Sequence, residues 1–234
     1  MKKYNRKINL VKIEKGLKKM FTRYKFSILS YAQEGEDLIL HLFFGNKKKG
    51  FYVDVGAHHP FRYSNTHFFY KRGWHGINIE PMPEAKKLFA CYRKRDINVQ
   101  KGISQKKEAL TYFEFKSNEY NTFNPENAEE YKKIGVQFLR SQLIETVPLS
   151  DILDEHVPPG TIIDFLSIDT EGFEMQVLNS NNWNKYEPVF IILESHEIRI
   201  EPHLTSDIHL FMKNKNYELV SKSFYSYIYR KVQP

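Results

Sequence analysis

The sequence is poor in cysteine and has no long hydrophobic run. Cys91 is the single cysteine among 234 residues, so no disulfide can form within the chain. This composition is typical of proteins in a reducing cytoplasm. No stretch approaches the roughly 20 consecutive apolar residues of a membrane-spanning helix, and Lys recurs too often near the N-terminus for a secretory signal peptide. We therefore expect a cytoplasmic protein with no membrane span.

The net positive charge of the chain is confined to the N-terminal segment. The formal net charge is +7, yet residues 1–25 hold ten Lys or Arg and one Glu, so the remaining chain carries a small net negative charge. A nearly neutral body argues against a nucleic-acid-binding surface. The spacing of apolar residues predicts a basic, amphipathic helical arm over residues 1–30. We favour packing of this arm on the body; the alternative is peripheral contact with an anionic membrane surface.

Short β-rich runs alternate with helical segments in the rest of the chain. Buried strands are predicted at residues 51–55, 76–80, 97–100, 162–169 and 188–194. Strands that alternate with helices predict a parallel sheet with helices on both faces. Two more β-rich runs, 217–220 and 224–230, predict an antiparallel hairpin at one end of the sheet. Residues 31–234 are therefore expected to form one α/β domain.

Residues 117–146 interrupt this alternation. The segment is polar and is predicted to contain a helix from Glu126 to about Arg140. We expect it to act as a lid or as an acceptor-binding insertion. Its best candidates for contacts with a substrate are Tyr120, Asn121 and Thr122.

Polar residues stand at the carboxyl ends of the predicted strands, where ligands of doubly wound sheets bind. They are Asp54 with Gly56, Glu80, Ser104, Asp169 with Glu171, and Glu194 with His196. Gly56 allows close approach of a ligand to the backbone. The G-x-G-x-x-G pattern is absent, so the turn lacks the later glycines of a pyrophosphate cradle and a ligand without phosphate fits better. Glu80 is placed to accept hydrogen bonds from both hydroxyls of a ribose.

Asp169, Glu194 and His196 are expected to converge from two adjacent strand ends. Oxygen ligands with one imidazole suit Mg²⁺ or Mn²⁺. One alternative is that Asp169 and Glu171 only cap the next helix and contact the acceptor. Another is that His196 acts alone as a general base. His58 and His59, in the loop after the first strand, are rival bases.

Several of these segments together resemble one known family. They are Gln33-Glu34-Gly35-Glu36-Asp37, Phe51-Tyr52-Val53-Asp54-Val55-Gly56-Ala57, Ser64-Asn65-Thr66, residues 73–81 and residues 163–174. In this order and spacing they resemble the FkbM family of S-adenosylmethionine-dependent methyltransferases, over roughly residues 30–197. The resemblance implies a class I, Rossmann-like methyltransferase fold. It also implies methylation of hydroxyl groups, often on sugars of surface glycans or on natural products.

The resemblance assigns roles to individual residues. It places Asp54, Gly56, Ala57, Glu80 and Asp169 around S-adenosylmethionine, with Asn65 and Thr66 beside them, Gln33 and Asp37 at the methionine end, and Ser104 near the adenine. Related sugar O-methyltransferases use a divalent ion that binds two vicinal hydroxyls. One departure is His58-His59-Pro60, where many members have Asn and a small polar residue. We interpret it as a trait of a subfamily that acts on bacterial surface polysaccharides.

These observations lead to one functional expectation and two alternatives. We expect an O-methyltransferase that acts on a sugar hydroxyl during capsule or O-antigen assembly, with a sugar or a sugar nucleotide as acceptor. The first alternative is methylation of a lipid-linked or small natural-product hydroxyl. The second is a non-catalytic binding module, which loss of Gly56, Glu80 or Asp169 would indicate; all three are present. A dehydrogenase would need the missing glycines.

Overall fold

The chain divides into two units, Met1–Ser30 and Tyr31–Pro234. The computed structural model describes residues 27–195 and 197–232, and most of the predicted arm over residues 1–30 lies outside them. Every helix and strand below belongs to the second unit. In the described part of the chain, no helix combines the length and apolar character needed to cross a membrane.

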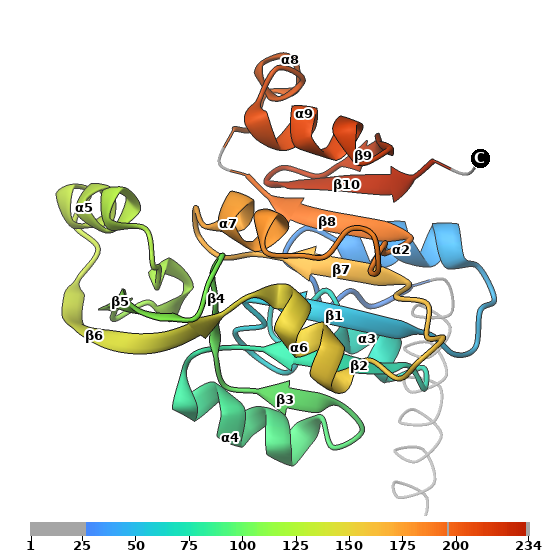
Figure 1. Cartoon of the computed structure of the whole chain (residues 1–234), viewed down its shortest axis with the longest axis horizontal. Coiled ribbons are helices and arrows are strands. Elements are labelled where there is room, and N and C mark those ends of the chain that lie inside the picture. The colour runs from blue at the N-terminus through green and yellow to red at the C-terminus, as the bar shows by residue number, and fades with distance from the viewer. Residues whose placement is uncertain (1–26, 196, 233–234) are drawn as a thin grey trace, which may run out of the picture. The chain divides into compact units, whose positions relative to one another are not determined.

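The second unit is built on a seven-stranded sheet (Figure 1). Its strands are β1 (Phe51–Val55), β2 (His75–Ile79), β3 (Ile97–Val99), β7 (Phe165–Ile168), β8 (Phe190–Glu194), β9 (Tyr217–Lys222) and β10 (Ser226–Lys231). Their order is β3-β2-β1-β7-β8-β10-β9. The first five strands pair in parallel, and β10 runs antiparallel to β8 and β9. The predicted class I methyltransferase fold, with its mainly parallel sheet and terminal hairpin, is confirmed.

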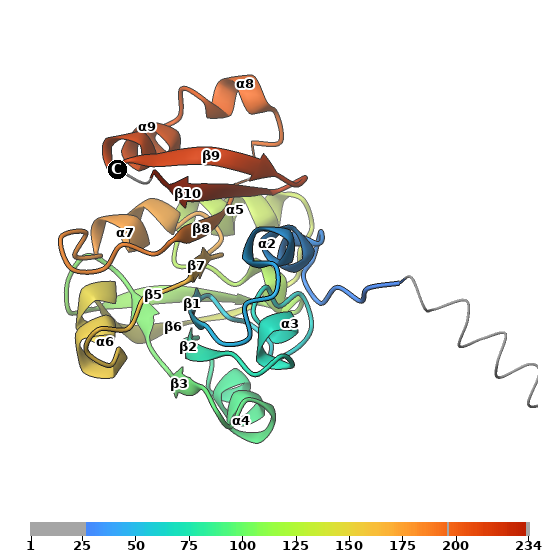
Figure 2. The same ribbon diagram turned by 90° about the vertical axis from the view of Figure 1, so that its right-hand side faces the viewer.

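Helices cover both faces of this sheet (Figure 2). They are α2 (Glu36–Phe44), α3 (His67–Tyr70), α4 (Pro83–Tyr92), α6 (Leu149–His156), α7 (Glu174–Asn179), α8 (Ile200–His203) and α9 (Asp207–Asn214). Successive side chains of a strand point to opposite faces. Val53 and Val55 of β1 therefore pack in a core with residues of α6 and α7. Tyr52 packs in a second core with residues of α2 and α3. All five residues of β1 are buried as a result.

A smaller, three-stranded sheet stands beside the main one (Figure 1). Its order is β4-β6-β5, formed by Gly102–Ile103, Phe138–Val147 and Glu108–Phe115 respectively, and α5 (Pro125–Lys133) and a 3-10 turn (Asn118–Tyr120) connect β5 to β6. We call residues 102–147 the wing. The predicted helix to about Arg140 was wrong in its second half. The helix ends near Gly135, whose φ of +89° is left-handed, and the following residues pair with β5 as a strand.

Candidate active site

A cavity of about 1120 Å³ opens between the carboxyl ends of the main-sheet strands and the wing. Ten of the predicted site residues line it: Gln33, Gly56, His58, His59, Glu80, Tyr120, Asn121, Asp169, Glu171 and Glu194. They come from segments far apart in the sequence. Those after the main-sheet strands come together because the carboxyl ends of parallel strands share one edge of the sheet, whereas Tyr120 and Asn121 come from the wing and Gln33 from the segment before α2.

Gly56 directly follows β1 at a position that has no room for a side chain. Its φ is +78°, and a Cβ atom built on it would lie 1.7 Å from the backbone oxygen of Asp169. The Gly56 N–H donates to the Ile79 carbonyl at 3.0 Å. This glycine therefore lets the loops after β1 and β7 approach each other at the floor of the cavity.

Glu80 presents a buried carboxylate at the end of β2. It is 7% exposed, and its two oxygens accept hydrogen bonds from the N–H groups of His58, at 2.9 Å, and Met82, at 3.0 Å. Burial raises the pKa of Glu80 to about 7, against the smaller lowering effect of these two hydrogen bonds. A carboxylate held in this way keeps lone pairs for two further donors, as the hydroxyls of a ribose would supply.

Asp54 and Thr66 do not line the cavity; they lie in a buried polar network behind it. Thr66 Oγ1 donates to Asp54 at 3.0 Å, and Arg93 donates to Thr66 at 2.8 Å. Burial raises the pKa of Asp54 to about 6, and the Arg93 charge counteracts that rise.

Arg93 joins this network to the loop after β1. Its side chain is fully buried, its Nε donates to Asp96 at 2.8 Å and its NH1 donates to the Pro60 carbonyl at 2.8 Å. Asp96 also accepts from the hydroxyl of Tyr52 at 2.8 Å. Sequence analysis did not identify Arg93. An Arg–Asp pair three residues apart at a helix end was the available signal, but most such pairs are exposed.

The two histidines after Gly56 differ in their hydrogen bonding. His58 has a left-handed φ of +50°, and its buried Nε2 atom has no hydrogen-bond partner among the described residues. Nδ1 of His59 accepts from the N–H groups of Phe61 and Arg62, at 3.3 and 3.1 Å. Neutral His59 is therefore assigned its proton on Nε2. With Nδ1 already accepting and Nε2 protonated, the ring has no free nitrogen to act as a base. Burial, reinforced by His58 and Arg62, lowers the pKa of His59. Of the two rival bases, this geometry favours His58.

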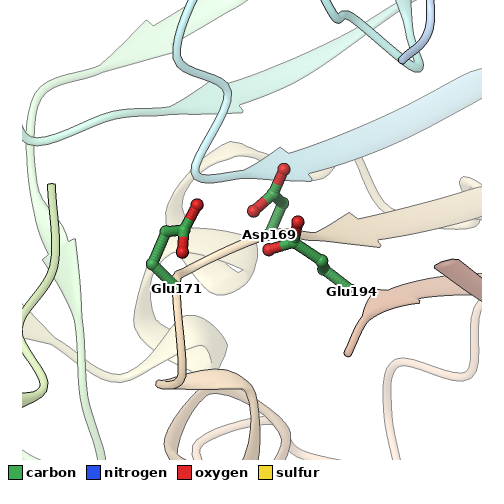
Figure 3. A group of neighbouring side chains, drawn as sticks. All are labelled: Asp169, Glu171 and Glu194. Carbon is green, nitrogen blue, oxygen red and sulfur yellow. The ribbon is translucent and has the colours of Figure 1, made fainter. Parts of the chain in front are cut away.

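Three carboxyl groups converge at the ends of β7 and β8. Atoms of Asp169, Glu171 and Glu194 lie within 4.8 Å of one another, and the side chains point toward a common centre (Figure 3). We call these three residues the acid cluster. Sequence analysis expected Asp169 and Glu194 to meet here. His196, the third residue of that expectation, lies outside the described residues, and Glu171 takes the third place.

Burial governs the protonation of the acid cluster. It raises the pKa of Asp169 to about 7, with a further rise from the charge of Glu171. Burial and the neighbouring charge of Asp169 raise the pKa of Glu194 far more. The two carboxyl groups share a hydrogen bond and titrate as a coupled pair, in which burial and mutual repulsion favour the protonated forms.

The N-terminal motif supplies one cavity residue and its support. Gln33 lines the cavity. Asp37 is fully buried, and its Oδ2 accepts from the N–H groups of Tyr31 and Ala32 at 2.7 and 3.3 Å. Asp37 therefore holds the segment that carries Gln33, at a distance from the cavity itself.

Four other predicted residues also lie off the main cavity. Asn65 donates to Ser167 Oγ at 3.1 Å and lines a small adjoining pocket with Gln33. Ala57 packs against α4. The hydroxyl of Ser104 bonds within the wing, to the Lys106 carbonyl at 2.7 Å and to Thr146 at 2.8 Å. Thr122, which is 1% exposed, donates to the Glu171 carbonyl at 2.8 Å.

Comparison with known proteins agrees with the class that the fold and site define, a class I methyltransferase. A family model described as a methyltransferase FkbM domain matches residues 54–219, well over half of the chain. The chain therefore belongs to the FkbM methyltransferase family, and it is an S-adenosylmethionine-dependent methyltransferase. A search of curated proteins gave no match.

A search of solved structures found methyltransferases of low sequence identity. One is the Burkholderia thailandensis 1,6-didemethyltoxoflavin-N1-methyltransferase, solved with 1,6-didemethyltoxoflavin and S-adenosylhomocysteine; it is 12% identical with a TM-score of 0.42, over 85% of this chain and 77% of that one. Another, from Klebsiella pneumoniae, is provisionally assigned as an O-methyltransferase; it is 9% identical with a TM-score of 0.36, over 90% and 83% of the two chains. These identities and TM-scores are too low to indicate a shared substrate.

Proposed function

We propose that the chain transfers a methyl group from S-adenosylmethionine to a sugar hydroxyl during bacterial surface polysaccharide assembly, in the cytoplasm. The observation that carries this proposal is the acid cluster at the carboxyl ends of β7 and β8. A neutral amine is a nucleophile without help, whereas a hydroxyl needs a base to remove its proton. Asp169, with a pKa raised by burial to about 7, is suited to that role at neutral pH.

The proposal divides the cavity into two parts. Glu80, Gly56 and Gln33 bind the cofactor, with Glu80 accepting from the ribose. The acid cluster faces the acceptor, where Glu171 binds a hydroxyl and Asp169 takes the proton as the methyl group is transferred. Nε2 of His58, which has no hydrogen-bond partner in the described part of the chain, is the alternative acceptor for that proton.

The charge of the cavity bears on the kind of acceptor. Eight acidic residues line it: Glu80, Glu84, Glu114, Glu119, Glu130, Asp169, Glu171 and Glu194. Three Lys or Arg residues line it, and two of them are paired with acids, Lys101 with Glu145 and Arg140 with Glu114. Two of the acids are themselves paired, Glu114 with Arg140 and Glu119 with Arg62, but the remaining six still outnumber the cations of the lining, so the lining disfavours a diphosphate. It favours an uncharged sugar of a growing glycan over a sugar nucleotide.

Exposed apolar residues at the same cavity favour a second candidate. Ile134 is 66% and Leu139 55% exposed, and both line the cavity from the wing. A lipid-linked sugar would place its hydroxyl at the acid cluster and cover these side chains with its apolar portion.

A divalent cation also fits the acid cluster. Carboxylate oxygens are ligands that Mg²⁺ and Mn²⁺ prefer, and buried Glu194 Oε2 has no hydrogen-bond donor among the described residues. Asp169, Glu171 and Glu194 would hold the ion. When bound, it would lower the pKa of a coordinated hydroxyl.

An acceptor panel tests the proposal. Uncharged oligosaccharides, lipid-linked sugars and nucleoside-diphosphate sugars are each incubated with the enzyme and S-adenosylmethionine, and products are analysed by mass spectrometry. We expect one added methyl group on a sugar oxygen, most with the uncharged acceptors. Methylation confined to nitrogen would contradict the proposal.

Asp169→Asn tests the base with the best acceptor. We expect kcat to fall by about 10² or more, the range typical of a lost general base. Asp154→Asn is the matched control, because Asp154 bonds to Lys185 and Tyr186 outside the cavity. Loss of turnover in EDTA, restored by Mg²⁺ or Mn²⁺, would assign the activation to a cation; near-normal activity of Asp169→Asn would remove Asp169 from the mechanism.

A further inference from the structure

Glu171 stands in a backbone conformation that a side-chain-bearing residue seldom adopts. Its φ is +53°, and that of the following residue, Gly172, is +91°. A non-glycine residue is strained in this region, so surrounding structure must hold it there. From inside the loop, Oε1 of Glu174 accepts from the N–H groups of Thr170 and Gly172, at 3.0 and 3.2 Å.

The wing holds the same loop from outside. Thr122 Oγ1 and Asn127 Nδ2 both donate to the Glu171 carbonyl at 2.8 Å, and Asn124 Nδ2 donates to the Gly172 carbonyl at 3.1 Å. A Cβ atom on Gly172 would lie 2.3 Å from Asn127 Nδ2. Three side chains of one short segment are therefore packed tightly against two consecutive residues.

A fourth contact reaches the carboxyl group of Glu171. The hydroxyl of Tyr131 donates to Glu171 Oε2 at 2.5 Å. Tyr131 is 6% exposed and packs with Phe115 and Ala128 in a small core within the wing. A phenol keeps its proton at neutral pH, so Tyr131 is the donor of this hydrogen bond and Glu171 is the acceptor.

We propose that the segment from Thr122 to Tyr131 is a clamp that sets the position of Glu171 in the acid cluster, with Tyr131 as the positioning residue for its carboxyl group. The inference rests on the proposed function, because it assigns Glu171 to the acceptor. The clamp accounts for the left-handed Glu171 and for the direction of its carboxyl group toward Asp169 (Figure 3). The wing then serves as a fixed support of the active site.

Tyr131→Phe tests the clamp, because it removes one hydroxyl and keeps the ring in its core. With the best acceptor, we expect kcat to fall about tenfold, the size of effect that misplacing a reacting group has in active sites. The affinity for S-adenosylmethionine should stay within about twofold, because Glu80 and Gly56 are untouched.

Two variants separate positioning from general damage. Tyr186→Phe is the matched control, because Tyr186 is also a buried phenol that donates to a carboxylate, Asp154, at 2.8 Å; it should keep wild-type kcat. In a Glu171→Gln background, Tyr131→Phe should have almost no further effect, because it acts through Glu171. Additive losses in the double variant would overturn the inference.

Amide hydrogen exchange provides a readout that needs no acceptor. In Tyr131→Phe, the amides of residues 169–174 should exchange roughly tenfold faster, because the loop opens locally, while those of β1 should be unchanged. Unchanged exchange in the loop would overturn the clamp whatever the activity. Failure of the wild-type enzyme on every sugar acceptor, with faster loop exchange in the variant, would overturn the proposed function and support the clamp.

Discussion

The variant Glu80→Gln tests the proposed cofactor site through the affinity for S-adenosylmethionine, measured as a function of pH. Burial raises the pKa of Glu80 to about 7, and both of its oxygens already accept from backbone N–H groups. Ribose hydroxyls donate most strongly to the ionised carboxylate, because the protonated acid carries its own proton on one oxygen and is a weaker acceptor. Wild-type affinity for S-adenosylmethionine should therefore increase about tenfold from pH 6 to pH 8, following the ionised fraction.

The variant should bind more weakly and lose this dependence. The substituted side chain would keep one acceptor oxygen, while its amide nitrogen would face the N–H of His58 or Met82. A lost hydrogen bond to a charged group is worth about 1.5–3 kcal/mol, or roughly 10- to 150-fold in affinity at pH 8. Isothermal titration calorimetry at several pH values measures both effects. Asp169 and Asp54 also titrate near this range, so the difference between the two curves isolates Glu80.

Stability without cofactor should change in the opposite direction. The folded pKa of Glu80 lies above its ordinary value of 4.5, so the folded state favours the protonated form. Its contribution is present below pH 4.5 and is lost as pH rises to about 7, at a cost of roughly 3 kcal/mol. Thermal unfolding should thus show a steeper fall with pH for wild type than for Glu80→Gln. Equal slopes, together with equal affinities at pH 8, would refute the placement of Glu80.

Two further substitutions test the parts of the structure that support the site. Arg93→Met should lower the free energy of unfolding by about 3–5 kcal/mol, because it leaves Asp96 buried without its cation; the exposed neighbour Arg95→Met is the control in urea titrations, and an equal effect would contradict the network. Gly56→Ala should abolish cofactor binding or folding, because its Cβ would overlap the Asp169 carbonyl. Gly135 also has a left-handed φ, but a Cβ atom built on it would have no neighbour within 4 Å. Circular dichroism and calorimetry on Gly56→Ala and Gly135→Ala therefore separate the effect of the steric clash from that of the backbone strain.

The main sheet could be predicted because its signals are local. Runs such as Phe51–Val55 and Phe190–Glu194 are apolar along most of their length, as strands buried on both faces must be. The rule that ligands bind at the carboxyl ends of such strands then selected Glu80 and Asp169. Both line the cavity.

The wing could not be predicted because its signals are not local. Residues 138–147 are mostly exposed, so they have no clear pattern of burial, and they form a strand through pairing with residues 108–115. The predicted helix extended from α5 to about Arg140 because the residues after Lys133 are compatible with either a helix or a strand. Only the left-handed Gly135 marks its end, and glycine is also tolerated within helices at some cost.

Buried partners of the site escaped prediction for a related reason. Arg93 and Asp37 are charged residues, and charged residues are mostly exposed unless they are paired. Whether a pair is buried depends on which loops cover it; here the Pro60 carbonyl and the hydroxyl of Thr66 complete the shell around Arg93. Nothing in the sequence near Arg93 specifies those partners.

The two parts of the proposed active site therefore differ in how the chain encodes them. The proposed cofactor side is formed by short sequence motifs directly after strands, such as Gly56 after β1 and Glu80 after β2. The acceptor side depends on contacts between segments about 40 residues apart, in which Tyr131 meets Glu171. A change in the wing can then move the acid cluster while the hydrogen bonds of Glu80 remain in place. We therefore expect variants of the wing to change kcat without changing cofactor affinity, and variants of Glu80 to change cofactor affinity.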